Sequence, residues 1–357
     1  MDLLRVGIIG TGRISDLHAI EYRANPRAQI VAVADVVREN AESRGRQWGV
    51  ADDHIFTDYH DLLALPDVDL VEILLPHHLH YQAALDAAAA KKHISLQKPM
   101  ALTLAEADQM IAAAKQAGVI FKVFENFIFY PPVQRAKALI DAGEIGEPLT
   151  IRIKSNSGTS PNMWNIPRAA EEWRFKSETC GGGPLVFDDG HHKFALAWHF
   201  MGLAEEVHAW IGATEREPGY ILDSPALVSW KFPNNRYGSL EVVYSPEMVL
   251  DTAHYAQDDR IEITGTRGVI WVTRGHGKMM DVPPVIMYRD RQTFTYSDMP
   301  VGWEHSFINS TRHFINAYHT GAPPVLTGEQ GRDVLRFTLA AQESARLGQS
   351  VKLEAFT

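Results

Sequence analysis

The sequence lacks most features that would place a chain outside the ordinary globular class. It has one cysteine, Cys180, so it forms no internal disulfide, which fits a reducing compartment. No apolar run approaches the length of a membrane span, and the N-terminus enters an apolar segment without the pattern of a signal peptide. Blocks of like charge and low-complexity tails are missing too. These absences lead us to expect a cytoplasmic protein.

Positive charge is scarce. The chain has 34 Lys and Arg against 44 Asp and Glu, a formal net charge of −10. Such an excess of carboxylates is not attracted to nucleic acid or to an anionic membrane surface, so we expect neither as a partner. The content of 45% hydrophobic and 22% charged residues is typical of a globular protein. A length of 357 residues is enough for two domains with separate cores.

The N-terminal segment has the pattern of a dinucleotide site. An apolar strand at residues 4–9 runs into a glycine-rich turn. Gly10 permits a tight turn, Gly12 lets the backbone approach a pyrophosphate, and Ser15 is small enough for close helix packing. The helix that follows presents its unpaired N–H groups to the phosphates. The turn residues expected at the cofactor are Gly10, Thr11, Gly12, Arg13 and Ile14.

Asp35 indicates which dinucleotide is bound. It ends a second apolar strand, residues 30–34, twenty-five positions after Gly10. A carboxylate there can accept hydrogen bonds from a ribose diol, and it repels a 2′-phosphate. The pattern therefore predicts NAD rather than NADP, although the nearby Arg38 could still accommodate a 2′-phosphate.

The alternation of apolar strands and helices over the first 125 residues predicts a parallel sheet covered on both faces, which is a Rossmann domain at residues 1–125. After residue 125 the pattern changes to strands of period two. We expect residues 126–357 to form an α/β domain with a large, mostly antiparallel open sheet. Its final helix, at residues 330–347, could pack back on the first domain.

Lys98 is the first candidate for chemistry. It lies in Gln97-Lys98-Pro99, just after a short strand at residues 93–96. Ligands of doubly wound sheets bind beyond the carboxyl ends of the strands, so this lysine is placed for proton exchange or substrate polarisation. A surface lysine before a turn proline is an equally good interpretation of the local sequence.

Asp188 and His192 are the second candidates, and they follow a glycine run. If a helix begins near Asp188, the two side chains lie one turn apart on one face. A carboxylate orients an imidazole and favours its protonated form, which suits a general base acting on an alcohol. Alternatively, Asp188 caps the helix and His192 is a core residue.

Histidines also cluster after the strand at residues 70–75. Position favours contact of Pro76, His77 and His80 with the cofactor, or capping of the next helix, over a zinc site, because no Cys or H-E-x-x-H pattern supports a metal. We predict no metal. Softer candidates for substrate binding are Trp164, Trp173, Arg174 and His191, and rim packing explains the aromatic residues equally well.

Taken in order, these motifs resemble the Gfo/Idh/MocA oxidoreductase family, named for glucose–fructose oxidoreductase and inositol 2-dehydrogenase. The glycine turn looks like the family's opening, and Gln97-Lys98-Pro99 is similar to its Glu-Lys-Pro signature. The segment from Asp188 to His192 is similar to its D-x-G-x-H motif. The likeness covers essentially the whole chain.

The resemblance implies hydride transfer between NAD(P) and a secondary alcohol of a sugar, cyclitol or related polyol. By matching position, Lys98 would orient and polarise the hydroxyl, His192 would remove its proton, and Asp188 would hold the histidine. It also implies that residues 126–357 bind substrate and mediate oligomerisation, as a homodimer or homotetramer formed through the C-terminal sheet. An alternative is a glycoside hydrolase or lyase that oxidises its substrate transiently and retains its cofactor.

Two departures from the family pattern stand out. Gln97 replaces the family's glutamate, so any contact of that residue with the cofactor ribose becomes a neutral hydrogen bond. Ala195 stands where the family often has Asp or Asn, so one substrate contact is missing or is supplied elsewhere.

Overall fold

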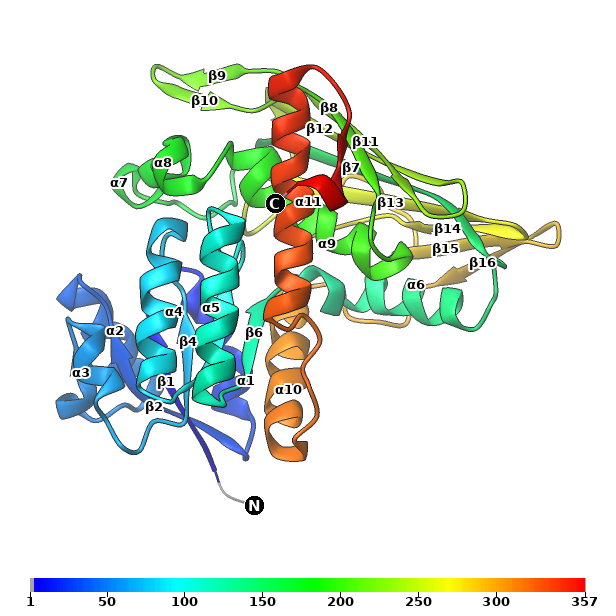
Figure 1. The fold of residues 1–357 in the computed structure, drawn as a ribbon. Coiled ribbons are helices and arrows are strands. Elements are labelled where there is room, and N and C mark those ends of the chain that lie inside the picture. The colour runs from blue at the N-terminus through cyan, green and yellow to red at the C-terminus, as the bar shows by residue number, and fades with distance from the viewer. Residues whose placement is uncertain (1–2, 357) are drawn as a thin grey trace. The chain divides into compact units, whose positions relative to one another are not determined.

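The computed structural model describes residues 3–356. The chain divides into two compact units (Figure 1). The first comprises Met1–Asn126 and Ser306–Leu335, and the second comprises Phe127–His305 and Arg336–Thr357. Within the described residues, no helix is both long and apolar enough to cross a bilayer.

The first unit contains a six-stranded parallel sheet in the described chain, in the order β3-β2-β1-β4-β5-β6. This is the strand order of a dinucleotide-binding Rossmann fold, and it confirms the predicted architecture. The strands are β1 (Leu4–Ile9), β2 (Ala28–Ala34), β3 (Ile55–Phe56), β4 (Leu70–Ile73), β5 (His93–Gln97) and β6 (Phe121–Phe124). The helices between them are α1 (Ser15–Ala24), α2 (Arg38–Trp48), α3 (Tyr59–Leu63), α4 (His80–Ala89) and α5 (Leu104–Ala117).

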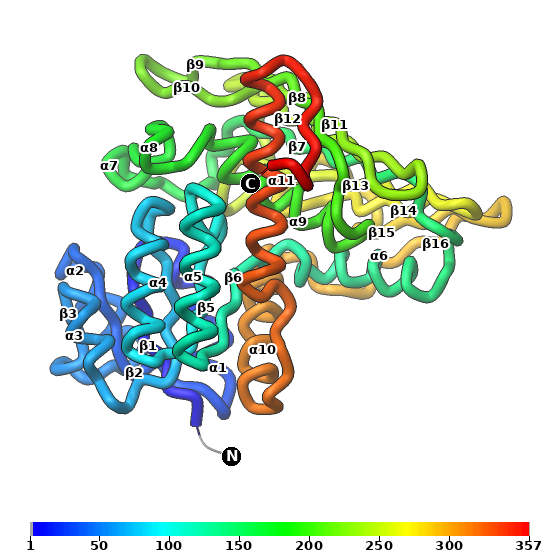
Figure 2. Tube along the Cα trace, in the orientation of Figure 1, coloured from blue at the N-terminus to red at the C-terminus, as the bar shows by residue number. Residues whose placement is uncertain are grey.

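A late segment of the chain returns to this sheet, as the trace in Figure 2 shows. Phe314 and Ile315 of α10 (Glu304–Thr320) pack in the same core as the β1 side chains. Just before α11 (Gly328–Leu347), the N–H of Val123 in β6 donates to the carbonyl of Leu326 at 2.9 Å. The chain therefore passes between the two units three times, after Asn126, after His305 and after Leu335, whereas the sequence predicted one boundary near residue 125.

The second unit contains a nine-stranded mixed sheet within the described residues, in the order β16-β15-β14-β13-β7-β12-β11-β8-β17. Only the pair β7–β12 is parallel, so the prediction of a mostly antiparallel sheet is confirmed. Its strands are β7 (Pro148–Thr159), β8 (Glu206–Ile211), β11 (Ala226–Phe232), β12 (Arg236–Val249), β13 (Gln257–Gly265), β14 (Gly268–Val272), β15 (Val285–Arg289), β16 (Gln292–Tyr296) and β17 (Val351–Lys352). A separate hairpin is formed by β9 (Thr214–Glu217) and β10 (Tyr220–Leu222).

Side chains alternate across this sheet, with Ile151 and Ile153 of β7 in the core and Arg152 and Lys154 on the other face. Such alternation is what a sheet with one packed face requires. The helices of the unit are α6 (Pro131–Asp141), α7 (Arg168–Glu171), α8 (Ser177–Cys180) and α9 (Gly190–Met201). The sequence analysis did not anticipate β9, β10, β15 and β16. The strands β9 and β16 are mostly polar and β10 spans only three residues, whereas β15 is apolar over residues 285–288 and was missed despite that pattern.

Candidate active site

The glycine turn lies between β1 and α1, at the carboxyl end of the sheet. Gly10 has φ +91°, and a Cβ there would stand 2.5 Å from the carbonyl oxygen of Leu74, so only glycine fits. A Cβ on Gly12 would meet nothing within 4 Å, which leaves open space next to this backbone. Ser15 is fully buried, and its hydroxyl donates to the carbonyl of Gly12 at 2.6 Å. A tight turn with open space before a helix N-terminus fits a bound pyrophosphate.

Asp35 is held against this turn. Its Oδ2 accepts from the backbone N–H of Thr11 at 2.7 Å and from the Thr11 hydroxyl at 3.1 Å. Its Oδ1 accepts from the N–H of Val37 at 2.9 Å. A carboxylate has about four acceptor positions, two on each oxygen, so Oδ2 is fully used and Oδ1 can still accept one hydrogen bond from a ribose hydroxyl. Arg38, the residue that could favour a 2′-phosphate, is paired with Glu42 at 3.2 Å.

The histidines after β4 have different environments. His77 is buried, whereas His78 is exposed. His80 is fully buried, with Nδ1 2.8 Å from the carbonyl oxygen of Pro99 and Nε2 2.8 Å from that of Leu75. Both ring nitrogens therefore face backbone carbonyls, and the expected contact of this ring with the cofactor is replaced by a structural role. Burial lowers the pKa of His80 to about 3. The two carbonyls act in the opposite direction, because they favour the protonated ring, but the effect of burial is larger.

We predict that His80→Ala lowers the free energy of unfolding by about 2–4 kcal/mol, because it removes the single N–H that the neutral ring donates to a buried carbonyl and leaves a cavity. Urea denaturation measures the loss. The matched control is His78→Ala, which removes an exposed ring and should change stability by less than about 0.5 kcal/mol. Equal effects of the two substitutions would contradict the structural role of His80.

Lys98 follows β5 at the carboxyl end of the sheet, and only 8% of it is exposed. The side-chain oxygen of Gln97 accepts from the backbone N–H of Lys98 at 2.8 Å. The amide nitrogen of Gln97 lies 3.1 Å from Nε2 of His18. Gln97, expected at the cofactor ribose, thus makes two contacts within the protein and keeps one N–H for a ligand.

Asp188 and His192 lie in the second unit, where helical structure begins earlier than predicted. A π-helical turn at Pro184–Asp189 precedes α9, so Asp188 is the next-to-last residue of that turn and His192 lies in the first turn of α9. Both side chains are largely buried, with 7% of each residue exposed. Oδ2 of Asp188 accepts from Nε of Arg174 at 2.9 Å. The ring of His192 stacks on Phe127, with centroids 4.3 Å apart and planes at 27°.

The adjacent histidine, His191, has a different environment, because consecutive helical residues point about 100° apart. Only 1% of it is exposed, and its Nδ1 lies 3.4 Å from the hydroxyl of Thr338 in α11. The structure therefore places His191 in the interior of the second unit, and its contact with a substrate stays a prediction. Ala195, on the same helix, is fully buried as well.

Trp164 belongs to an aromatic cluster of the second unit that the sequence analysis missed. Its ring centroid lies 5.0 Å from that of His254 and 5.6 Å from that of Tyr255. Trp303 joins the cluster at 4.8 Å from His276. The same His276 ring lies 5.9 Å from Phe127, the ring that stacks on His192. The members come from distant segments, so no local motif could identify them: Phe127, Trp164, His254, Tyr255, His276 and Trp303.

Trp173 and Arg174 lie in one turn before the glycine run. The indole N–H of Trp173 donates to the carbonyl of Ala170 at 3.1 Å, and the guanidinium of Arg174 lies 4.6 Å from the Trp173 ring centroid. Arg174, expected to bind substrate, thus also serves the candidate acid–base pair through Asp188. Among residues 3–356, no group of three or more His, Cys, Asp or Glu side chains could hold a metal ion.

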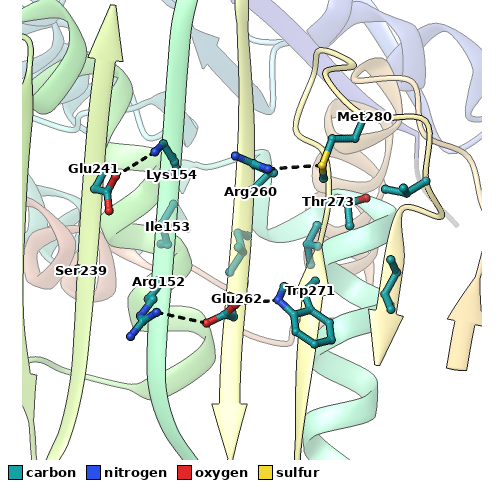
Figure 3. Close-up of a pocket in the computed structure, with 14 residues that line it drawn as sticks. Arg152, Ile153, Lys154, Ser239, Glu241, Arg260, Glu262, Trp271, Thr273 and Met280 are labelled. Carbon is teal, nitrogen blue, oxygen red and sulfur yellow. Dashed lines mark hydrogen bonds and ion pairs between the residues drawn. The ribbon is translucent and has the colours of Figure 1, made fainter. Parts of the chain in front are cut away.

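The outer face of the large sheet forms a shallow pocket, drawn in Figure 3. Ion pairs cross between its strands, with Lys154 3.1 Å from Glu241 and Arg152 3.8 Å from Glu262. Trp271 donates its indole N–H to Glu262 at 2.7 Å. This face combines apolar side chains such as Met280, Val282 and Ile286 with paired charges, and it contains none of the candidate catalytic residues.

A Rossmann unit with a dinucleotide turn, joined in the chain to a mixed-sheet unit, defines an NAD-binding oxidoreductase. The model of an oxidoreductase family with an NAD-binding Rossmann fold, GFO_IDH_MocA, matches residues 4–125. The model of the family's C-terminal alpha/beta domain matches residues 137–353. The chain therefore belongs to the Gfo/Idh/MocA oxidoreductase family, as the motifs indicated, and NAD is its cofactor.

Relatives match over nearly the whole chain. An uncharacterized oxidoreductase, YrbE, of Bacillus subtilis is 30% identical over 98% of this chain and 96% of its own length. The myo-inositol 2-dehydrogenase of Thermotoga maritima is 29% identical over 98% of this chain and 99% of its own length. The crystal structure of an oxidoreductase from Agrobacterium radiobacter, in complex with NAD+, L-tartaric acid and magnesium, has a TM-score of 0.86 at 22% identity, with 99% of each chain covered.

Proposed function

We propose that this protein is a dehydrogenase that uses NAD to oxidise a secondary alcohol of a sugar, cyclitol or related polyol. The observation that supports it most is the buried Lys98 at the carboxyl end of β5, in a unit of an NAD-binding family. Ligands of such sheets bind at that edge, and burial of a lysine is costly unless the site uses its charge.

Lys98 acts on the oxygen of the reacting hydroxyl. When the hydroxyl proton leaves, negative charge develops on this oxygen, and an ammonium group beside it stabilises that charge more strongly than the neutral alcohol. Exclusion of water around the buried side chain strengthens the interaction. When NAD is bound, it accepts the hydride from the carbinol carbon.

His192 takes the hydroxyl proton in this proposal. The stack on Phe127 fixes the orientation of the His192 ring through its face, and it uses neither ring nitrogen. Asp188 stabilises the imidazolium that forms, because an opposite charge nearby favours a protonated ring. The pairing of Asp188 with Arg174 at 2.9 Å keeps this carboxylate ionised and fixes one of its oxygens.

The substrate class follows from the aromatic cluster and from the relatives. Aromatic rings bind the C–H faces of sugar and cyclitol rings, and the imidazole and phenol groups of His254, His276 and Tyr255 can hydrogen bond to hydroxyls. Burial lowers the pKa of His276 to about 3, so its ring is neutral and can both donate and accept. The relative that is a myo-inositol 2-dehydrogenase supports a polyol substrate.

We further infer a homodimer or homotetramer formed through the outer face of the nine-stranded sheet. Three features support this face: its apolar side chains, its paired charges, and exposed side chains such as Trp210 and Leu227 on neighbouring strands. Exposed apolar patches rimmed by polar groups are typical of protein interfaces.

A screen of inositols, monosaccharides and glycosides with NAD and with NADP, followed at 340 nm, tests the proposed activity. The expected result is net formation of NADH with at least one polyol. Cleavage of a glycoside without net NADH would instead identify the redox-assisted hydrolase or lyase. Tight NAD binding without turnover of any compound would contradict both activities.

Asp35 should set the choice of cofactor. We predict that Asp35→Ser weakens NAD binding about tenfold, roughly 1.4 kcal/mol, and reduces discrimination against NADP, because the carboxylate that accepts from the ribose is lost. Calorimetric titration of each cofactor measures both effects. Asp53→Ser, which removes an exposed carboxylate from the same unit, is the control and should bind NAD like the wild type. Unchanged NAD affinity in Asp35→Ser would rule out the ribose contact.

A further inference from the structure

A buried chain of hydrogen bonds leads from α1 and β4 to Lys98 within the first unit. Oε2 of Glu72 accepts from the hydroxyl of Tyr22 at 2.7 Å, and its Oε1 lies 2.8 Å from Nδ1 of His18. Nε2 of His18 lies 3.1 Å from the amide nitrogen of Gln97, and Gln97 accepts from the backbone N–H of Lys98. Tyr22, Glu72 and His18 are all fully buried.

The donors and acceptors allow one consistent direction for this chain. The Gln97 oxygen is used by Lys98, so its NH₂ group faces His18 and can only donate. Nε2 of His18 must then be the acceptor, which places the ring proton on Nδ1, where it is donated to Glu72. Every hydrogen bond thus runs toward the Glu72 carboxylate. With this tautomer of His18, every donor in the chain faces an acceptor.

The surroundings hold this arrangement rigidly. The His18 ring packs 4.0 Å from Phe124 and 5.1 Å from Phe307, measured between ring centroids. Lys122 interacts electrostatically with Glu72. Its Nζ donates to the backbone carbonyl and to the hydroxyl of Ser310, at 2.8 Å each. Burial lowers the pKa of Lys122 to about 7, although Glu72 and Glu125 oppose this. In a protein interior of low polarity, hydrogen bonds are stronger than in water, and a buried polar group that loses its partner destabilises the fold more.

We propose that Glu72, His18 and Gln97 form a buried relay that positions Lys98, with the carboxylate that the Glu-Lys-Pro signature carries at position 97 displaced to Glu72. The relay fixes the backbone N–H of Lys98 through Gln97, and His18 sets the direction in which Gln97 must point. These three are positioning residues, and their importance for turnover rests on the proposed function of Lys98.

The protonation of His18 tests the relay without any substrate. In the full-length protein labelled with ¹⁵N-histidine, NMR should show His18 as a neutral ring with the proton on Nδ1, with its signals assigned by their loss in His18→Gln. Gln97→Glu places carboxylates on both sides of the ring, so His18 should become doubly protonated. The exposed substitution Gln47→Glu adds the same charge on α2 and should leave the His18 signals unchanged.

An exchange variant makes a sharper prediction. In Glu72→Gln with Gln97→Glu, the acceptor moves to the other side of the ring, so the proton should move from Nδ1 to Nε2 and the chain should reverse direction. If Gln97→Glu alone fails to fold, the proton position of His18 in this double variant still tests the relay. A His18 ring with its proton on Nε2 in the wild type, or one that ignores both substitutions, would overturn the relay.

Kinetics separate positioning from cofactor contact. Gln97→Leu removes both hydrogen bonds of the amide, so kcat should fall about tenfold or more, with the Kd for NAD changed by less than about threefold. A large loss of NAD affinity with unchanged kcat would show that Gln97 acts as a cofactor contact and would overturn the positioning role. If no substrate is found, the proposed dehydrogenase fails but the NMR result still decides the relay.

Discussion

Lys98→Ala should lower kcat by about 100- to 1000-fold while changing the Kd for NAD by less than about threefold. The ammonium group stabilises charge that develops only in the transition state, so its removal costs about 2.7–4 kcal/mol in the barrier and little in cofactor binding. Stopped-flow or steady-state assays with the substrate found by the screen measure kcat, and calorimetry measures the Kd.

Two variants make the Lys98 result interpretable. Lys98→Met keeps most of the side-chain volume, so a loss of kcat equal to that of the alanine variant assigns the effect to the charge rather than to a cavity. Lys115→Ala removes an exposed lysine from α5 and should have wild-type kcat. A Lys98→Ala protein with near wild-type turnover would remove the basis of the proposed mechanism.

His192→Phe should lower kcat by about 100- to 10,000-fold at neutral pH, because it removes the base that takes the hydroxyl proton. Phenylalanine can keep the stack on Phe127, with centroids now 4.3 Å apart, so the packing of α9 should change little. The loss should shrink as the pH rises, since hydroxide can replace the missing base. The pH dependence of kcat measures this directly.

A second stacked histidine provides the control for this substitution. His60 lies 4.3 Å from Tyr59 with planes at 24°, almost the same ring geometry, but it is exposed and far from the candidate residues in sequence. His60→Phe should leave kcat unchanged. If His192→Phe retains full activity with an unchanged pH profile, another group is the base.

The first unit was largely predictable because its signals are local. Gly10 must be glycine for steric reasons, and strands apolar on both faces can only form a covered parallel sheet. Position in the chain then placed Lys98 at the carboxyl end of β5. Local patterns did not predict the short β3 and α3, nor the return of α10 to this unit.

The remaining features depend on contacts between distant segments. His191 and His192 are neighbours in sequence, and only the packing of Thr338 against His191 shows which ring is in the core. Glu72 looked like one polar residue in an apolar strand, and its partners Tyr22 and His18 are about 50 positions away. The aromatic cluster around Trp164 likewise joins residues that no periodicity connects.

The central claim is that the protein moves hydrogen from a carbinol carbon to NAD. Its most direct test uses a polyol from the screen that carries deuterium at the oxidised carbon, with mass spectrometry of the cofactor after turnover. Each molecule of reduced cofactor should carry one deuterium. The same should hold for Lys98→Ala, in which the reduced cofactor forms more slowly. Product formed with no deuterium in the cofactor would contradict it.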